Sequence, residues 1–365
     1  MKILLLVIIF TFNLFIPLIS STYHVVLASQ NDLTIQQAIS RAVQGNNQIR
    51  TIQENAEVSV DNIELRRANV PYGQNITAFI NHQAGVMQAV EERATYLRNI
   101  QSTRDTLGFL AATQFINILI AEGAFALGEA ELELYQNELQ ILRARISVGH
   151  ASELEYNLKA LSVDALYQNM QTLINQIEHA QVELNRLMSS QTNNRHNLIF
   201  DVDYNEMVVL NFNGHLNNHR QNHALVRQAV GTANIARYRY ENFFIEFDET
   251  GQQLPVAQTR EELMLLFNLT SRNIASARDN VVDHIVNTYY RIREIEQNII
   301  IQELQLSDQK REATVLQTRL RVGEILPIDI ERHALEILRT EENLRRSKFN
   351  HYLLEMQFRN PNIAF

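Results

Sequence analysis

Apolar residues recur at alternating steps of four and three along two long stretches of the chain. The first series begins at Leu107 and ends at Gly149, and the second runs from Val281 to Gly323. This a/d heptad pattern is typical of a helix that packs along its whole length against partner helices. At about 1.5 Å per residue, the segment from Leu107 to Ser147 would be about 60 Å long, so the pattern predicts a rod rather than a compact globule.

The two series are copies of each other. Adding 174 to each residue number of the first series gives the corresponding position of the second series, so that Leu107 corresponds to Val281. Glycine is the last residue of both series. Because phase, length and last residue agree, we interpret the chain as an internal repeat of about 170 residues. The predicted segments are a signal peptide (1–28), a first helical-hairpin repeat (29–198), a connecting segment (199–212) and a second repeat (213–365), with both repeats in one elongated domain.

Each long helix is expected to end in a tight turn that leads into a returning helix. Gly149 and Gly323 stand where a left-handed residue ends a helix, Ser152 with Glu155 forms a capping box, and Pro327 suits a first helical turn. The first return has a regular seam from Val163 to Leu187, whereas the second has as candidate core positions Ala334, Ile337, Leu344, Leu353 and Met356. The predicted fold class is therefore mainly all-α, a tandem repeat of long antiparallel helical hairpins of the α-barrel or coiled-coil type.

Shorter helices are expected to open each repeat. Thr34 with Gln37 caps a first helix, Asn46-Asn47 breaks it, and a second runs to about Ala68. The stretch 216–240 has the pattern of a counterpart in the second repeat. Between the repeats, 197–212 contains strand-like apolar runs that would lie at the side of the rod.

Composition supports long helices and excludes several kinds of chemistry. The chain has five prolines, none of them between Pro71 and Pro255, and no cysteine, which removes disulfides, thiolate metal sites and cysteine nucleophiles. The net charge of −9 argues against a nucleic-acid partner, because binding nucleic acid requires a basic surface.

The N-terminus predicts export. Lys2 is followed by an apolar run from Ile3 to Ile19, and Val26-Leu27-Ala28 offers small residues for a signal-peptidase cut after Ala28. An uncleaved anchor is the alternative, because the run is long for a signal segment and short for a membrane span. Either way, the rest of the chain would lie outside the cytoplasm.

Several of these sequence features together resemble those of a known protein family. The segment 33–39 (LTIQQAI), the break at Asn46-Asn47, the tandem repeat and the paired Val-Gly turns together resemble the TolC-type outer-membrane efflux protein family. The resemblance implies a trimer that closes a hollow cylinder of helices in the cell envelope. It also implies that the hairpin tips bind a membrane-fusion adaptor protein of an efflux or secretion pump. The matching tip positions are Arg145, Val148, Gly149, His150, Ala151 and Ser152 in the first copy, and Arg319, Val322, Gly323, Glu324, Ile325 and Leu326 in the second.

The sequence departs from the family where membrane strands are expected. A strand that crosses the bilayer needs about 9–11 residues. The first junction, 70–86, offers at most the strand-like Ile76–Ile80, and the second a short hairpin of 243–247 and 252–256 that turns at 248–251. We therefore predict helices without a complete membrane β-barrel, with at most short β-hairpins at the helix junctions.

No catalytic motif or cofactor site is predicted. His215, His219 and His223 would follow one face of a helix, but no acidic ligand accompanies them, so we interpret them as a solvated face rather than a metal site. The stretch 201–205 opens like a calcium loop and fails at Glu206, which replaces the turn glycine. Glu91-Glu92 and Glu341-Glu342 are interpreted as surface charge on helices.

Small residues on the first seam, Ala111, Ala121 and Gly128, have two interpretations. They are either loosely packed heptad sites or places where two helices approach closely. The chain itself favours a non-catalytic conduit subunit that oligomerises through its long helices. A coiled-coil spacer or scaffold without a lumen is the alternative, and a secreted helical bundle that enters other membranes is a third possibility.

Overall fold

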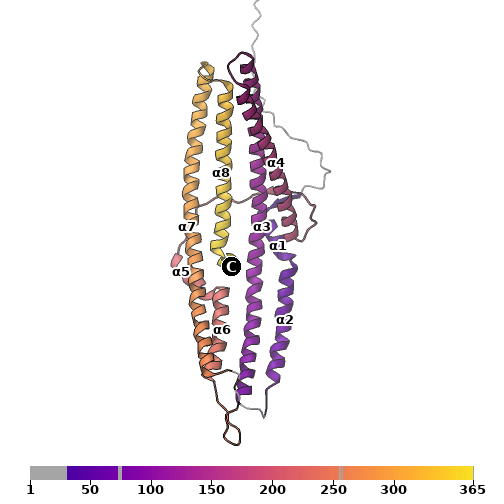
Figure 1. Cartoon of the computed structure of the whole chain (residues 1–365), viewed down its shortest axis with the longest axis vertical. Helices are drawn as coiled ribbons and strands as arrows, with labels where there is room; N and C mark the ends of the chain where they lie inside the picture. Colours follow the sequence, from indigo (N-terminus) through magenta and orange to yellow (C-terminus); the bar gives the residue numbers. More distant parts are fainter. Residues whose placement is uncertain (1–30, 73–75, 255, 257, 365) are drawn as a thin grey trace, which may run out of the picture.

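The longest element is α3, which runs without interruption from Ile76 to Ser147 in the computed structural model of the chain. Its 72 residues correspond to a length of about 108 Å. The structure describes residues 31–72, 76–254, 256 and 258–364, so the predicted signal peptide lies outside the described residues. The helices lie nearly parallel to one another and form a rod (Figure 1).

Two antiparallel hairpins make up one half of the rod. In the first, α3 turns into α4 (Glu153–Leu187), and in the second α7 (Arg260–Arg321) turns into α8 (Pro327–Arg359). The ends of α3 and α7, and the starts of α4 and α8, are related by the same offset as the two seams. Both turns lie at the same end of the rod, and α3 packs beside α8 where the two hairpins meet (Figure 1). The predicted tandem repeat of helical hairpins is confirmed.

Shorter helices complete the other half. They are α1 (Ile35–Gln44), α2 (Asn47–Ala68), α5 (Phe212–Asn222), α6 (Ala224–Glu241) and the 3-10 helix η1 (Pro361–Ala364). Along α3, α2 follows where α4 ends, and along α7, α6 follows where α8 ends (Figure 1). Each repeat is thus one long helix with two shorter helices packed along it in succession.

A small sheet joins the start of the described chain to the end of the first repeat. Strand β1 (Asn31–Thr34) pairs in parallel with β2 (His196–Ile199), with Leu33 opposite Leu198. Of the strand-like stretch 197–212, only the part within β2 forms a strand. The following segment has no strand partner among the described residues. Phe200 lies against Phe349 and Met207 is buried beside α7, whereas Val208 and Leu210 are exposed.

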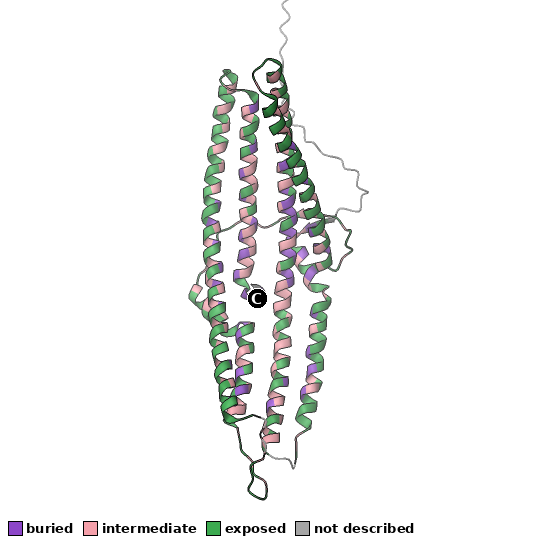
Figure 2. Ribbon diagram, viewed as in Figure 1, coloured by how far each residue is buried: buried purple, intermediate pink, exposed green. Residues whose placement is uncertain are grey.

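The predicted seams form the core. Both series between Leu107 and Ile146, and between Val281 and Leu320, are buried or partly buried at every a/d position, and burial is most complete near the middle of the rod (Figure 2). Gly128 distinguishes the two interpretations of the small residues. A Cβ atom placed there would lie 3.2 Å from the Cγ atom of Met170, so this position allows α3 and α4 to approach closely.

The core of α8 differs from the expectation. Ala334 is exposed, so its assignment to the core was wrong, whereas the Leu344 assignment is correct. The observed seam follows Thr340, Leu344, Ser347, His351, Leu354 and Phe358 at steps of four and three, and all six are buried or partly buried. Its polar members, Thr340, Ser347 and His351, conceal the heptad from a search for apolar residues.

The junctions opposite the tips also differ in part. Ile76–Ile80 forms the first turn of α3 rather than a strand, and its amide at Thr77 donates to the carboxylate of Glu246 at 2.9 Å. The second junction contains the predicted turn, with Gly251 at φ +79°, but only one bridge, between Phe247 and Gln253. In the described residues of both junctions no strand is longer than this bridge.

One described helix, α3, contains a window long and apolar enough to cross a membrane by composition. Of that window 44% is buried inside the structure. The core helix of a soluble protein passes the same test, and apolar residues of α3 do lie in a core cluster with α1, α4 and α8.

Candidate functional site

The first hairpin tip is a tightly closed turn at the end of α3. The amide of Gly149 donates to Ile146 O at 3.0 Å and that of His150 to Arg145 O at 2.8 Å, a pair of bonds that ends the helix in a Schellman motif. Gly149 has φ +76°, a conformation that side chains with a Cβ atom disfavour. Ser152 and Glu155 then cap α4 reciprocally, as the sequence predicts. Val148 is 65% exposed, so its apolar side chain faces outward.

The second tip repeats this geometry. Gly323 has φ +78°, its amide donates to Leu320 O at 3.0 Å, and the amide of Glu324 donates to Arg319 O at 2.9 Å. Pro327 is the first residue of α8, where its missing N–H has no consequence. The side chains of Val322 and Leu326 are exposed, and Ile325 and Ala151 are partly buried in their turns. All twelve predicted tip residues therefore lie at one end of the rod.

The two tips differ in charge. In the second, Arg319 Nε lies 3.1 Å from Glu324 Oε2, so an acidic group already lies beside the guanidinium. The residue equivalent to Glu324 in the first tip is His150, and no described carboxylate pairs with the equivalent arginine, Arg145. The first tip thus presents an arginine that is free to meet an acidic group of a partner.

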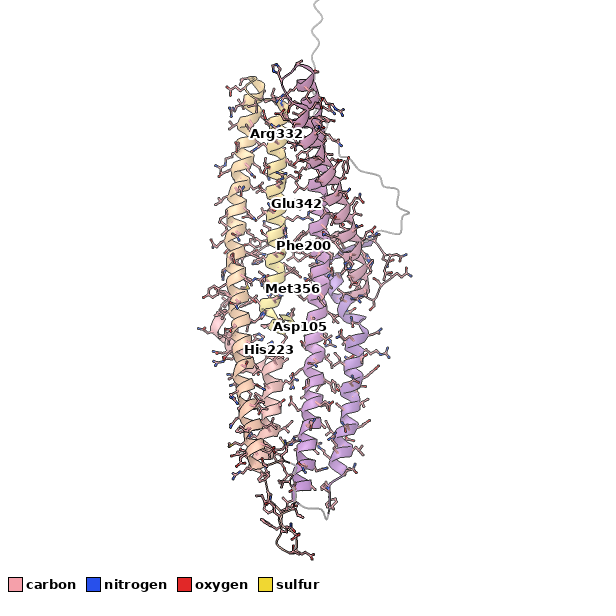
Figure 3. The ribbon with its side chains drawn as sticks, viewed as in Figure 1. Asp105, Phe200, His223, Arg332, Glu342 and Met356 are labelled. Carbon is pink, nitrogen blue, oxygen red and sulfur yellow. The ribbon has the colours of Figure 1, made fainter. Side chains whose placement is uncertain are left out.

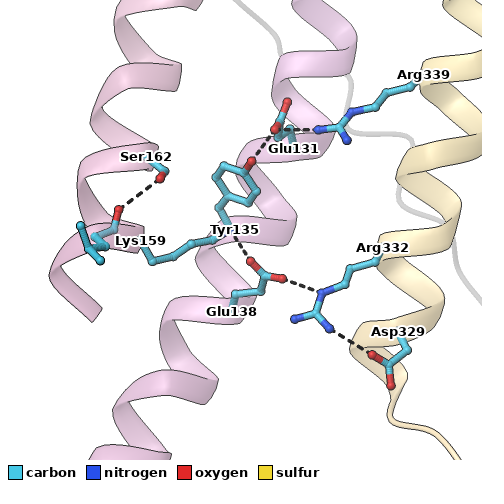
Figure 4. Close-up of polar contacts among 9 residues, drawn as sticks. Glu131, Tyr135, Glu138, Lys159, Ser162, Asp329, Arg332 and Arg339 are labelled. Carbon is cyan, nitrogen blue, oxygen red and sulfur yellow. Dashed lines mark hydrogen bonds and ion pairs between the residues drawn. The ribbon is translucent and has the colours of Figure 1, made fainter. Parts of the chain in front are cut away.

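Below the tips, a charged network joins α3, α4 and α8 (Figure 4). Glu138 of α3 accepts from Arg332 of α8 at 2.8 Å and pairs with Lys159 of α4. Burial alone would raise the pKa of Glu138, but hydrogen bonds from Lys159 and Arg332, together with their charges, lower it below the ordinary value. The carboxylate therefore stays ionised and connects three helices.

A second part of the network lies nearer the start of α3. Glu131 accepts from Arg339 of α8 at 2.8 Å and from the hydroxyl of Tyr135 at 2.6 Å, and this last bond raises the pKa of Tyr135. Lys159 lies 3.2 Å from the centre of the Tyr135 ring, a cation–π contact. Sequence reasoning missed this network. Charged residues beside the seams are its only signal, and they do not specify a partner in the other repeat.

A buried carboxylate holds the segment between the repeats. Glu296 of α7 accepts from the Met207 amide at 2.7 Å, from Arg293 at 2.6 Å and from His351 at 3.2 Å. Burial raises the pKa of Glu296, but the bonds from these three groups outweigh it and lower the pKa. Arg293 also donates to Met207 O at 3.0 Å, so both backbone groups of Met207 are held. This cluster was not predicted either.

The three histidines are not a solvated face, so that interpretation was wrong. The His215 ring stacks on Phe358 and its Nε2 lies 2.9 Å from Phe358 O, while His223 is buried between α5 and α6 and lies near Pro361. Burial, with the neighbouring imidazoles of His215 and His223, lowers the pKa of His219 to about 4. Through Phe358 and Pro361, the histidines hold the C-terminal segment near the middle of the rod, where Figure 3 labels His223.

The paired glutamates and the stretch 201–205, which the sequence analysis also considered, have structural roles. Glu91 pairs with Arg98, and Glu342 with Arg345, whereas Glu92 accepts from Tyr96. The stretch 201–205 lies in the extended segment between the repeats. Among the residues that the structure describes, no group of three or more His, Asp or Glu side chains is arranged to hold a metal ion.

Comparison with known proteins shows which solved structures have a similar fold. No protein-family model matches the sequence, and no curated protein sequence matches it, whereas solved structures do. The outer membrane protein VceC of Vibrio cholerae has a TM-score of 0.63 at 12% identity, over 88% of this chain and 94% of that one. The transmembrane channel protein CusC has 0.64 at 10%, over 91% and 92%.

The MtrE outer membrane channel of Neisseria gonorrhoeae is similar as well, with a TM-score of 0.57 at 14% identity, over 88% of both chains. At such identities the likeness concerns the fold alone. The chain has the helical fold of TolC-type outer-membrane efflux channels, as the resemblance implied.

Proposed function

We propose that this protein is a non-catalytic subunit of a cell-envelope conduit that assembles through α4 and α7 and binds an adaptor protein at its hairpin tips. The proposal draws on the fold and on faces of the two hairpins that have no partner within one copy of the chain. The TolC-type resemblance suggests three copies and an outer-membrane-associated position.

One observation supports the proposal above all: α3 packs against α8 within the chain, whereas the equivalent helices under the repeat, α7 and α4, do not pack against each other. Where the hairpins meet, Leu127 and Ile141 of α3 pack with Leu134, Ile328 and Leu335. The repeat offset relates these positions to others on the remaining two helices, namely Ile301 and Val315 of α7, and Leu154 and Leu161 of α4. These four side chains are 57–66% exposed.

The two open faces are complementary. Since α3 packs against α8, the same contact repeated between copies would bring α7 of one copy against α4 of the next. Such a contact joins different surfaces head to tail, and it forms a closed ring when the rotation between copies closes. Burial of exposed leucine, isoleucine and valine side chains would then stabilise the ring by about 1–2 kcal/mol for each side chain.

A closed ring of these rods suggests a passive duct. Flow through it would be driven by a partner, and the aperture at the tips would select what enters. The adaptor would contact Val148, Val322 and Leu326, which are exposed at the tips. Arg145 would bind an acidic group of the adaptor more readily than Arg319, which already pairs with Glu324.

Engineered cysteines test the assembly directly, because the chain has no cysteine of its own. Asn137 of α3 donates to Glu331 of α8 at 3.0 Å, and the equivalent pair between copies is Arg311 and Asn157, both exposed. In the double variant Asn157→Cys, Arg311→Cys, oxidation should link copies into disulfide-bonded oligomers. A reducing agent should return them to monomers.

The matched control pairs Arg311→Cys with Val58→Cys, because Val58 is exposed on α2, away from both faces. It should stay monomeric on a denaturing gel. Equal cross-linking in both variants, or none in either, would contradict the assembly. An assembled ring whose electron-microscopy images have no central opening would favour the scaffold instead.

A further inference from the structure

The end of the rod opposite the tips carries exposed apolar side chains from two separate connections. Those on the α2–α3 connection and the first turn of α3 are Tyr72, Ile76 and Phe79, and those on the α6–α7 connection are Phe244, Ile245 and Phe247. Tyr72 is 85% exposed and Phe247 62%. We call these six residues the basal surface. Aromatic side chains exposed together at one end of a molecule mark an interaction site.

The two connections form one unit. The carboxylate of Glu246 accepts from the Thr77 amide at 2.9 Å, so the second connection caps the first turn of α3. Phe243 and Phe244 line a shared pocket with Thr77 and Ile80. The α6–α7 connection is therefore fixed to the first turn of α3, and the exposed aromatic side chains of both connections lie at the same end of the rod.

The hairpin that carries Phe247 is preformed. Asp248 Oδ1 accepts from the amides of Thr250 and Gln252, both at 2.8 Å, and Gly251 takes the left-handed conformation that the turn requires. Next to the turn, Phe247 and Gln253 pair with each other in an antiparallel bridge. Because this geometry already exists, little conformational entropy is lost when Phe247 becomes buried.

The charge around the basal surface favours one kind of partner. The sequence from Ala68 to Val90 contains no Asp, Glu, Lys or Arg. Around the basal surface, the acidic residues Asp248, Glu249, Glu261 and Glu262 outnumber the basic residues Arg66, Arg67 and Arg260 at the end of α2 and the start of α7. A largely uncharged aromatic surface with an acidic edge is unsuited to an anionic membrane and fits the interface of a zwitterionic bilayer, where aromatic rings lie among the headgroups.

We propose that the basal surface binds the surface of a zwitterionic phospholipid bilayer and anchors this end of the rod without crossing the hydrocarbon. Tyr72, Phe244 and Phe247 enter the headgroup region, and the acidic turn stays hydrated. Asp248 is compatible with this position because its carboxylate is already hydrogen-bonded within the hairpin. The inference uses the opposite end of the rod from the tips and other surfaces than α4 and α7.

The absence of tryptophan makes the test specific. Phe247→Trp introduces one fluorophore into the basal surface, and Val322→Trp introduces one at the tip, where Val322 is 67% exposed. With the full chain and vesicles of phosphatidylcholine and phosphatidylethanolamine, the basal reporter should shift to the blue and be quenched by brominated lipid. The tip reporter should show neither effect.

A serine pair gives an independent readout. Phe244→Ser, Phe247→Ser should weaken partitioning into these vesicles about tenfold or more. The matched pair Val148→Ser, Val322→Ser should leave it unchanged, and the N-terminal apolar segment is common to every variant. Vesicles rich in phosphatidylglycerol should bind the chain more weakly.

Unchanged emission of Phe247→Trp on addition of vesicles, or equal partitioning of both serine pairs, would overturn the inference. A blue shift that follows protein concentration in the absence of lipid would also overturn it and assign the surface to a second copy. Cysteine cross-linking between α4 and α7 reports on the ring alone, so the two proposals can fail separately.

Discussion

Glu138 and Arg332 belong to different repeats, and their Oε1 and Nε atoms lie 2.8 Å apart across the boundary between the two. Beside them, Leu134 packs with Ile328 and Leu335. A boundary of apolar contacts flanked by ion pairs therefore fixes how one hairpin lies on the other. The same boundary is the template for the proposed contact between copies.

Removal of the Glu138 charge should weaken this boundary. In Glu138→Gln, Lys159 and Arg332 lose their shared carboxylate, which is only 13% exposed. We expect the free energy of unfolding in urea to fall by about 1–2 kcal/mol. Glu54→Gln, in a hydrated pair with Arg50, should change it by less than about 0.5 kcal/mol. An equal effect of the two variants would contradict the assigned role of Glu138.

The histidines should make stability depend on pH. The folded pKa of His219, about 4, lies below the unfolded value of 6.5, so the unfolded chain binds more protons between these values. Stability should therefore fall as the pH is lowered from 6.5 towards 4. Urea midpoints at about pH 7.5 and about pH 5 should differ less in His219→Asn than in the unchanged protein. His179→Asn, on an exposed face of α4, should retain the full difference.

Glu296 should control the segment between the repeats. Its pKa is lowered, so its contribution is complete above the unfolded value of 4.5 and is lost as the pH falls through the folded value. At neutral pH, Glu296→Ala leaves the Met207 amide without its acceptor. Hydrogen exchange of the segment 202–209 should become faster. Glu294→Ala, exposed on the same helix, should not change it; protection that persists in Glu296→Ala would argue against the clamp.

The tip glycines should be sensitive to any side chain. Gly149→Ala and Gly323→Ala place a Cβ atom at φ +76° and +78°, and each should cost about 1 kcal/mol of stability in urea unfolding. Gly45→Ala is the control, because Gly45 ends α1 at φ −99°, where alanine is tolerated. The double variant Gly149→Val, Gly323→Val should distort both tips and abolish adaptor binding. Unchanged binding would show that the tips are not the contact surface.

Charges on the open faces should prevent assembly. Leu154→Glu with Leu161→Glu places carboxylates on α4 where α7 of another copy is expected, and sedimentation should give a monomer. Val58→Glu with Leu210→Glu adds the same charge to exposed apolar positions elsewhere and should leave assembly unchanged. Assembly that survives the α4 pair would move the interface to another face.

Much of the fold could be predicted because it depends on the residue pattern along the sequence. The left-handed glycines and the capping box at Ser152 follow from short stretches of sequence, and the offset between the repeats follows from two long heptad series; the structure reproduces all three. The extension of α3 back to Ile76 could not be predicted. The uncharged stretch around Phe79 and Gly85 has no regular heptad, and it is helical because α2 and Glu246 hold it.

The remaining features depend on contacts between distant residues. His351 lies in the α8 seam because Glu296, on another helix, accepts from it. His223 is buried because the C-terminal segment folds back onto it near Pro361. The polar sequence around these histidines predicts exposure, and only the long-range packing reverses that prediction. The conformation of the tips was predictable, whereas the pairing of Arg319 with Glu324 required the positions of their side chains.

Light scattering of the chain without its predicted signal peptide, that is 29–365, tests the central claim most directly. The open faces of α4 and α7 predict that, as protein concentration rises, the mass becomes a whole-number multiple of the protomer, and the TolC-type fold suggests three copies. A strictly monomeric mass at high protein concentration would contradict the proposed conduit.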